Sequence, residues 1–126
     1  MDFNTYFDKV GGSYDEVIGR LGKDERIVKY TKMFLSSPEH DDLLTAISDG
    51  NFAEAFRHSH SMKGVCANLG LENLRKSASD LCEELRPCGS GENPLPEPAT
   101  DITPLLEKVK EDYAVAVEAI KEHFAD

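Results

Sequence analysis

Residues 52–70, with the sequence FAEAFRHSHSMKGVCANLG, predict a single amphipathic helix that ends at a glycine. At about 100° per residue, small and apolar side chains gather within one arc of this helix, and that arc should face a core. The arc consists of Phe52, Ala55, Phe56, Ser59, Met62 and Cys66. Asn51 followed by Glu54 resembles an N-cap pair, and Gly70 tolerates the left-handed conformation that often ends a helix.

The segments on either side of this helix also carry helical patterns, and none shows the sustained alternation of a half-buried strand. Antiparallel amphipathic helices joined by short loops bury their apolar sides best as a bundle. The sequence therefore predicts an all-α fold, an antiparallel up-and-down four-helix bundle with short N-terminal helices added. The expected parts are a leading helical segment within 1–12, bundle helices within 13–86 and 100–124, and a surface loop over 88–99.

Local signals set the expected helix ends. Asp24 should cap the helix that follows it, and Ser37 should cap the next one, with Pro38 at its first helical position. Pro87 should stop the helix that precedes the loop, because proline cannot donate a backbone hydrogen bond. Residues 88–99 contain three Pro and two Gly, which is typical of an irregular surface loop.

Size and charge limit the classes of function. The 126 residues, 40% of them hydrophobic, suffice for one core, so residues 1–126 are expected to form a single domain. The formal net charge of -10 argues against nucleic acid or an anionic membrane as a partner, because both attract Lys and Arg. No run approaches the roughly 20 apolar residues of a membrane-spanning helix, and the first residues lack the features of a signal peptide. We therefore expect a cytoplasmic protein.

The three cysteines, Cys66, Cys82 and Cys88, form neither an even set nor a CxxC pair. A disulfide framework or a zinc site is therefore not expected. The thiols should be reduced, with Cys66 and Cys82 as small apolar residues of the core.

His60 is the residue best placed for chemistry. It lies at the margin of the apolar arc, so its ring should rest on the bundle while its outer nitrogen meets water. Its neighbours along this face, Ala53, Gly64 and Ala67, are all small. A glycine within a helix costs about 1 kcal/mol relative to alanine, and we expect the compensation here to be access. A side chain at position 64 would lean toward His60, whereas bare backbone lets a second protein approach the imidazole.

Two cations flank His60 at helical spacing. Lys63, three residues later, should reach a phosphate on the ring, and Arg57, three residues earlier, should add positive potential on the outer side. A neutral imidazole keeps a nucleophilic lone pair near neutral pH, and access favours its outer nitrogen, Nε2. An acidic protein thus places positive charge beside one accessible histidine, which indicates a phosphoryl acceptor.

The run His60-Ser61-Met62-Lys63-Gly64, continued by Val65-Cys66-Ala67-Asn68-Leu69-Gly70, resembles the signature of histidine-containing phosphotransfer (HPt) domains, H-x-L-K-G followed by small residues and a closing Gly. The resemblance implies that His60 is phosphorylated, that Lys63 supports the phosphate and that Gly64 opens the face. Met62 stands where Leu is usual, which is a near-isosteric apolar change. The likeness covers residues 14–86 well, and 100–124 only through the helical pattern.

The same resemblance implies the partners. The phosphoryl donor and acceptor would be Asp-bearing receiver domains of hybrid kinases or response regulators. Mg²⁺ would belong to the receiver, so this chain would need no cofactor or metal of its own. Residues beside His60, namely Ala53, Arg57 and Ala67, are candidates for partner contacts. A monomer is favoured because one bundle can bury all the apolar stripes.

Other polar residues are predicted to be structural or solvated. His58 lies two residues from His60 and points to a different side of the helix, near Val65 and Leu69. A metal site made from His58 and His60 fails, because helical ligands pair at i, i+3 or i+4. Solvated acidic faces are expected at Asp41, Asp42, Glu83 and Glu84.

Three functions from different classes remain open. The first is a phosphorelay carrier. The second is a stand-alone histidine domain like that of a chemotaxis kinase, phosphorylated in trans, and the third is a helical adaptor without chemistry. The chain has no nucleotide-binding loop and no kinase signature, so no ATP-dependent kinase activity of its own is expected. An adaptor would be expected to lose the histidine or crowd its face, which favours the carrier.

Overall fold

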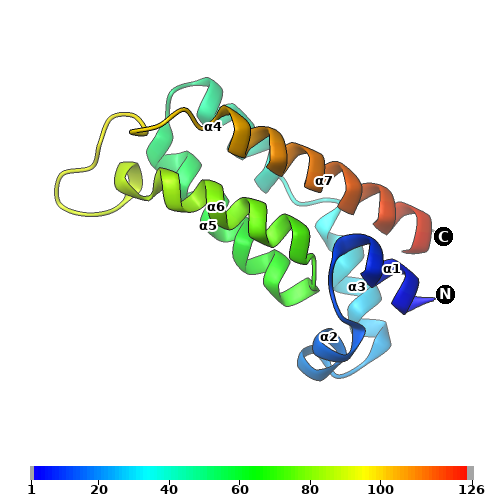
Figure 1. Ribbon diagram of the computed structural model, residues 1–126. Helices are drawn as coiled ribbons and strands as arrows, with labels where there is room; N and C mark the ends of the chain where they lie inside the picture. The colour runs from blue at the N-terminus through cyan, green and yellow to red at the C-terminus, as the bar shows by residue number, and fades with distance from the viewer. Residues whose placement is uncertain (1, 125–126) are drawn as a thin grey trace.

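A computed structural model of the protein describes residues 2–124. In this part of the chain every regular element is an α-helix, so the predicted all-α fold is confirmed. The helices are α1 (Phe3–Val10), α2 (Tyr14–Leu21), α3 (Asp24–Phe34), α4 (Glu39–Ser48), α5 (Phe52–Leu69), α6 (Glu72–Gly89) and α7 (Thr103–Phe124) (Figure 1). None of these described helices combines the length and the apolar character that crossing a lipid bilayer would require.

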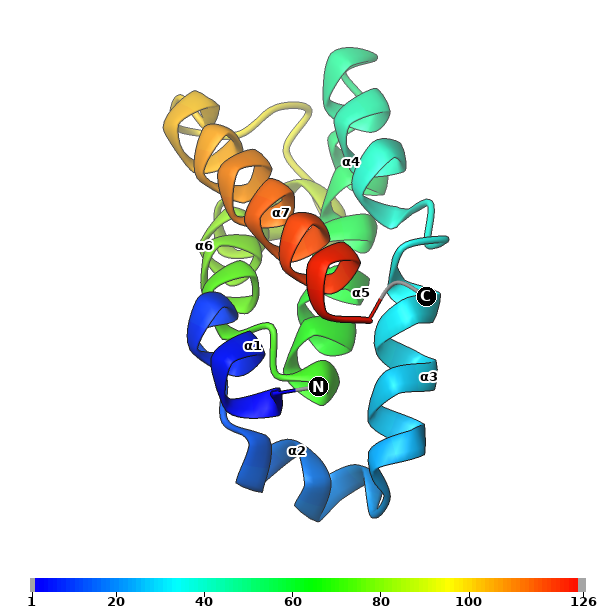
Figure 2. The same cartoon turned by 90° about the vertical axis from the view of Figure 1, so that its right-hand side faces the viewer.

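The helices pack as the predicted four-helix bundle, in which two shorter helices, α3 and α4, together take the place of one long helix. α5 lies along α6, α6 contacts α7, and α4 packs against α5. α3 and α4 lie one after the other and form the fourth member of the bundle, and α3 contacts both α5 and α7 (Figure 2). α1 covers one end of α7, where the Tyr6 and Phe124 ring centroids are 4.5 Å apart. The histidine helix α5 therefore has neighbours on two sides.

The starts of α3 and α4 differ by one residue from the prediction. Pro38 itself occupies the N-cap of α4, and Ser37 accepts a hydrogen bond from the backbone N–H of Glu39 at 3.4 Å. Lys23, rather than Asp24, precedes the first turn of α3. The Asp24 carboxylate instead accepts a hydrogen bond from the Tyr14 hydroxyl at 2.6 Å. A side chain used in a contact between helices is not available to cap its own helix.

Pro87 does not stop α6, contrary to the prediction. The helix continues through it to Gly89, so the loop begins two residues later than the predicted 88–99. Pro87 is on the exposed side, where the lost hydrogen bond leaves a carbonyl to water, whereas Cys88 is buried in the core. Gly89 lies directly on Phe56, whose ring would be 2.4 Å from a β-carbon at position 89. Packing of this last turn outweighs the local effect of the proline.

Both predicted ends of α5 are confirmed. The Asn51 side chain accepts a hydrogen bond from the backbone N–H of Glu54 at 3.2 Å. Gly70 has a φ of 75° and donates its backbone N–H to the Cys66 carbonyl. A β-carbon at Gly70 would also approach the Val17 side chain to 2.5 Å, so both conformation and packing require glycine there.

His40 is a buried histidine that links α4 to α7. Its ring is only 7% exposed and lies parallel to the Tyr113 ring, with the centroids 3.7 Å apart. Burial lowers the pKa of His40 below its ordinary value of 6.5, the carboxylate of Asp41 partly opposes this shift, and the charge of Lys110 adds to it. The folded protein therefore favours a neutral His40.

We expect the free energy of unfolding to fall as the pH is lowered through and below 6.5, because the unfolded chain then binds a proton at His40 that the folded chain resists. Stability from this group is complete above that pH and is lost below it. His40→Phe keeps a ring on Tyr113 but removes the proton site. Urea unfolding of both proteins at about pH 7.5 and about pH 5 measures the effect. If His40→Phe lost as much stability as the wild type between these two pH values, His40 would not be the group responsible.

Candidate functional site

His60 stands on the exposed side of α5. Its ring leans on Phe56, one turn earlier on the same helix, with the two ring centroids 5.9 Å apart. Phe56 is 9% exposed and belongs to the core cluster. The imidazole is therefore supported from below by an aromatic ring and is exposed to solvent on its outer side.

The small residues around His60 leave an open strip along α5. Gly64 is exposed, and a β-carbon at that position would meet no atom within 4 Å. The prediction that a side chain there would crowd His60 is therefore wrong for a methyl group. Only a longer side chain could cover the imidazole. Ala53 and Ala67 are half-buried and continue the strip one or two turns away on either side.

The two cations predicted near His60 differ in their present contacts. Arg57 is exposed and forms an ion pair with Glu54, three residues before it on α5. Lys63 is half-buried, and within residues 2–124 no carboxylate lies within ion-pair distance of its ammonium group. Lys63 can therefore bind a new anion without first breaking an ion pair, whereas Arg57 cannot.

His58 contacts α4, a helix that the prediction of a different side from His60 did not name. Its Nδ1 lies 2.8 Å from a carboxylate oxygen of Glu39, and its Nε2 lies 3.8 Å from Glu54 on its own helix. Among the described residues, no group of three or more His, Cys, Asp or Glu is arranged to hold a metal ion.

The sequence analysis missed a contribution from α6. Glu83, predicted only as part of a solvated face, accepts two hydrogen bonds from Arg86, at 2.9 and 3.3 Å. The guanidinium carbon of Arg86 lies 5.1 Å from the centroid of the Phe56 ring, which also supports His60. The register of the α5–α6 hairpin could have indicated that Glu83 lies close to His60. Residues nearly equidistant from the turn at Gly70 face each other, which places Glu83 opposite His60.

The pKa of Glu83 is lowered, first by the hydrogen bond from Arg86 and by the charge of that guanidinium. Positive charge on Lys63 and on His60 lowers it further. Glu83 thus interacts electrostatically with the two residues that carry the predicted chemistry.

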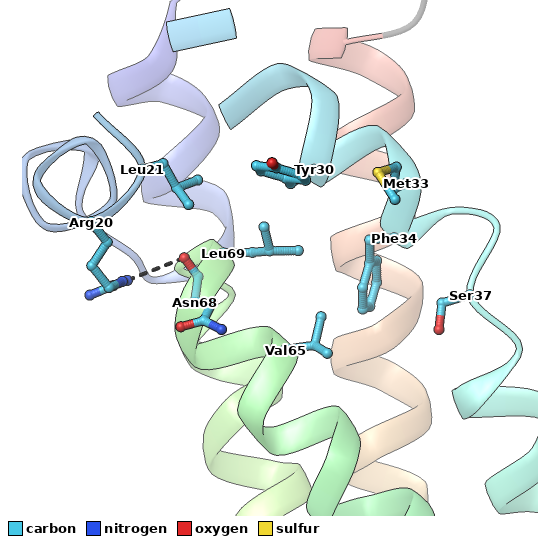
Figure 3. A pocket seen from close by; sticks show the side chains of 9 residues that line it. All are labelled: Arg20, Leu21, Tyr30, Met33, Phe34, Ser37, Val65, Asn68 and Leu69. Atoms are coloured by element: carbon cyan, nitrogen blue, oxygen red, sulfur yellow. Dashed lines mark hydrogen bonds between the residues drawn. The ribbon is translucent and has the colours of Figure 1, made fainter. Parts of the chain in front are cut away.

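An apolar groove of about 520 Å³ lies between α3 and the C-terminal end of α5. Its lining residues are Arg20, Leu21, Tyr30, Met33, Phe34, Ser37, Val65, Asn68 and Leu69 (Figure 3). Three of the large hydrophobic side chains that the protein exposes, Tyr30, Met33 and Val65, are in this groove. Asn68 lies one turn after Gly64, so the groove adjoins the open strip that contains His60.

Arg20 ties α2 to the end of the histidine helix. Its guanidinium donates hydrogen bonds to the carbonyl oxygens of Ala67, at 2.7 Å, and Asn68, at 3.5 Å; the second is the dashed line in Figure 3. These carbonyls belong to the last turn of α5, where the negative end of the helix dipole favours a cation. No signal within residues 52–70 indicates this contact, because its donor lies far away in the sequence.

Comparison with known proteins identifies a family for this chain. A model of the Hpt domain matches residues 31–122, a range that contains all of α4, α5 and α6, with His60, Lys63, Gly64 and the Glu83–Arg86 pair inside it. No curated protein and no solved structure matches the chain.

Proposed function

The chain belongs to the Hpt domain family, and we propose that it is a phosphocarrier in which His60 takes a phosphoryl group from one receiver domain and passes it to another. Hpt domains carry out histidine phosphotransfer in phosphorelay signalling, with receiver domains as partners. The observation that supports His60 as the carrier is its exposure on the open strip of α5, within the run His60-Ser61-Met62-Lys63-Gly64. No other described histidine stands beside both a lysine and a helical glycine at this spacing.

The proposed reaction uses the neutral imidazole as the nucleophile. The Nε2 lone pair forms a bond to phosphorus while the bond between phosphorus and the receiver's aspartyl oxygen breaks, and the electron pair leaves with that oxygen. The proton on Nδ1 stays on the ring. Lys63 turns toward the phosphoryl oxygens and offsets their charge, which is about −1.5 to −2 near neutral pH.

The proposed receiver footprint covers the open strip and the adjoining groove. Ala53 and Ala67 allow close approach, and Arg57 lies beside the strip with its guanidinium exposed. The exposed apolar side chains of the groove offer area to a partner's apolar surface. We assign Mg²⁺ to the receiver and no cofactor to this chain, and we propose that a cytoplasmic monomer acts as the carrier.

Transfer between isolated receiver domains tests this function. A receiver carrying a ³²P-labelled aspartyl phosphate should label the protein at His60, and the label should be acid-labile and base-stable. A second receiver should then remove it. No label from any phosphorylated receiver of the source organism, or labelling only by the catalytic domain of a kinase, would overturn the relay role.

Lys63→Ala should slow phosphoryl transfer from the receiver by about tenfold, because the half-buried ammonium of Lys63 offsets the charge that develops on the phosphoryl oxygens. Binding of the unphosphorylated receiver should change little, since Gly64 and the groove are intact. Rapid-quench kinetics give the rate, and titration calorimetry gives the affinity. Lys63→Arg, which keeps the charge, should recover part of the rate. A wild-type transfer rate in Lys63→Ala would remove Lys63 from the mechanism.

A further inference from the structure

The ion pair of Glu83 and Arg86 on α6 is not used by the transfer described above, although it adjoins the same face. Arg86 donates two hydrogen bonds to the Glu83 carboxylate and lies over the Phe56 ring at 5.1 Å. The His60 ring leans on that same phenyl ring, with a centroid distance of 5.9 Å. The guanidinium of Arg86 and the imidazole of His60 therefore both lie close to the Phe56 ring.

Ion pairs with glutamates limit the number of cationic side chains that can bind a phosphate on His60. Arg57 and Arg86 are each engaged by a glutamate three residues earlier on the same helix, Glu54 and Glu83. Lys63 has no such partner in the part of the chain that the structure describes. The site therefore meets a phosphoryl group with one available cation instead of three.

Glu83 also interacts electrostatically with the two residues of the proposed transfer. The charges of His60 and Lys63 contribute to the lowered pKa of its carboxyl group, after the larger effects of Arg86. After phosphorylation the same carboxylate repels the phosphoryl oxygens.

We propose that Glu83 is a positioning residue that keeps the phosphoryl group on His60 transferable by holding Arg86 away from the phosphate. This inference rests on the proposed function of His60. Glu83 sets the lifetime of phospho-His60, while His60 and Lys63 carry out the transfer.

The chemistry of onward transfer explains why a freed Arg86 would slow it. The N–P bond breaks, its electron pair returns to Nε2, and a carboxylate oxygen of the accepting receiver forms the new bond to phosphorus. With a proton on Nδ1 the imidazole leaves as a neutral ring, which is a much better leaving group than its anion. A freed Arg86 that bound the phosphoryl oxygens of phospho-His60 would stabilise the starting state and slow this step.

Glu83→Gln should therefore make phospho-His60 longer-lived by about threefold to fivefold, the range expected for exposed charges. Its equilibrium with a receiver should shift toward phosphohistidine by a similar factor. The ³¹P NMR chemical shift of phospho-His60 should also move in Glu83→Gln and move back when Arg86→Gln is added, a signal that a merely structural role of Glu83 would not change. Phosphoramidate, a small phosphoryl donor, can load all variants with ³²P in the same way.

Glu107→Gln on α7 is the matched control, since Glu107 forms an exposed i,i+3 pair with Lys110 at 3.4 Å. It should leave the lifetime unchanged, and Glu83→Asp, which keeps the charge, should stay close to wild type. Adding Arg86→Gln to Glu83→Gln should cancel part of the gain in lifetime.

Two failures can be told apart. If wild-type protein carries no label on His60, the proposed function falls and this inference falls with it. If wild type is labelled but Glu83→Gln and Glu107→Gln have the same phosphohistidine lifetime and the same ³¹P chemical shift, only the role of Glu83 is overturned.

Discussion

His60→Gln should abolish phosphoryl transfer to the protein completely, with no residual label from a phosphorylated receiver. Glutamine has nearly the same reach as histidine but no ring nitrogen that can form a bond to phosphorus. His60 is exposed, and its described ring contact is with Phe56, so the loss of the ring should cost little stability. Circular dichroism should show unchanged helicity, and the receiver should still bind.

His58→Gln is the control within the same helix. His58 contacts Glu39 on α4 at 2.8 Å and lies on another side of α5, so this variant should lose some stability but keep the label. Transfer at the wild-type level to His60→Gln would defeat the assignment of His60. Loss of label in His58→Gln at unchanged helicity would show that the wrong histidine had been chosen.

The residues of one helix were the easiest part of the site to predict. His60, Lys63 and Gly64 are related by helical spacing alone, and that spacing holds wherever a helix forms. The caps at Asn51 and Gly70 were predicted for the same reason, since each depends on a few adjacent residues.

Contributions from neighbouring helices were not predicted, because they depend on register and packing. The Glu83–Arg86 pair reaches the site only through the alignment of α6 on α5. Arg20 reaches the end of α5 from α2. A pattern within residues 52–70 contains no information on either alignment.

Pro87 shows how packing can outweigh a local rule. Proline removes one backbone hydrogen bond from α6, yet the helix continues because the next residues have partners in the core. Cys88 is buried and Gly89 lies on Phe56, the ring beneath His60. The two added residues of α6 therefore help to fix the aromatic support of the site, and the local signal for a loop was wrong there.

Gly64→Gln should reduce transfer from a receiver by about 100-fold or more while making the protein more stable. A glycine inside a helix costs about 1 kcal/mol relative to good helix formers, and at position 64 no atom stands within 4 Å of an added β-carbon. The folded protein alone would therefore favour a side chain there. A glutamine is long enough to cover the open strip beside His60, and a displacement of about 1 Å in the approach of a reactant can cost 100-fold in rate.

Gly64→Ala is the matched variant that separates the two effects. Its methyl group should bring the same gain in stability, measured by urea unfolding, with a much smaller loss of transfer, because a methyl does not reach the imidazole. Phosphoramidate, which needs no protein surface, should label His60 in all three proteins at similar rates. If Gly64→Gln accepted phosphate from a receiver as fast as wild type, the glycine would not serve partner access, and its cost in helix stability would need another explanation.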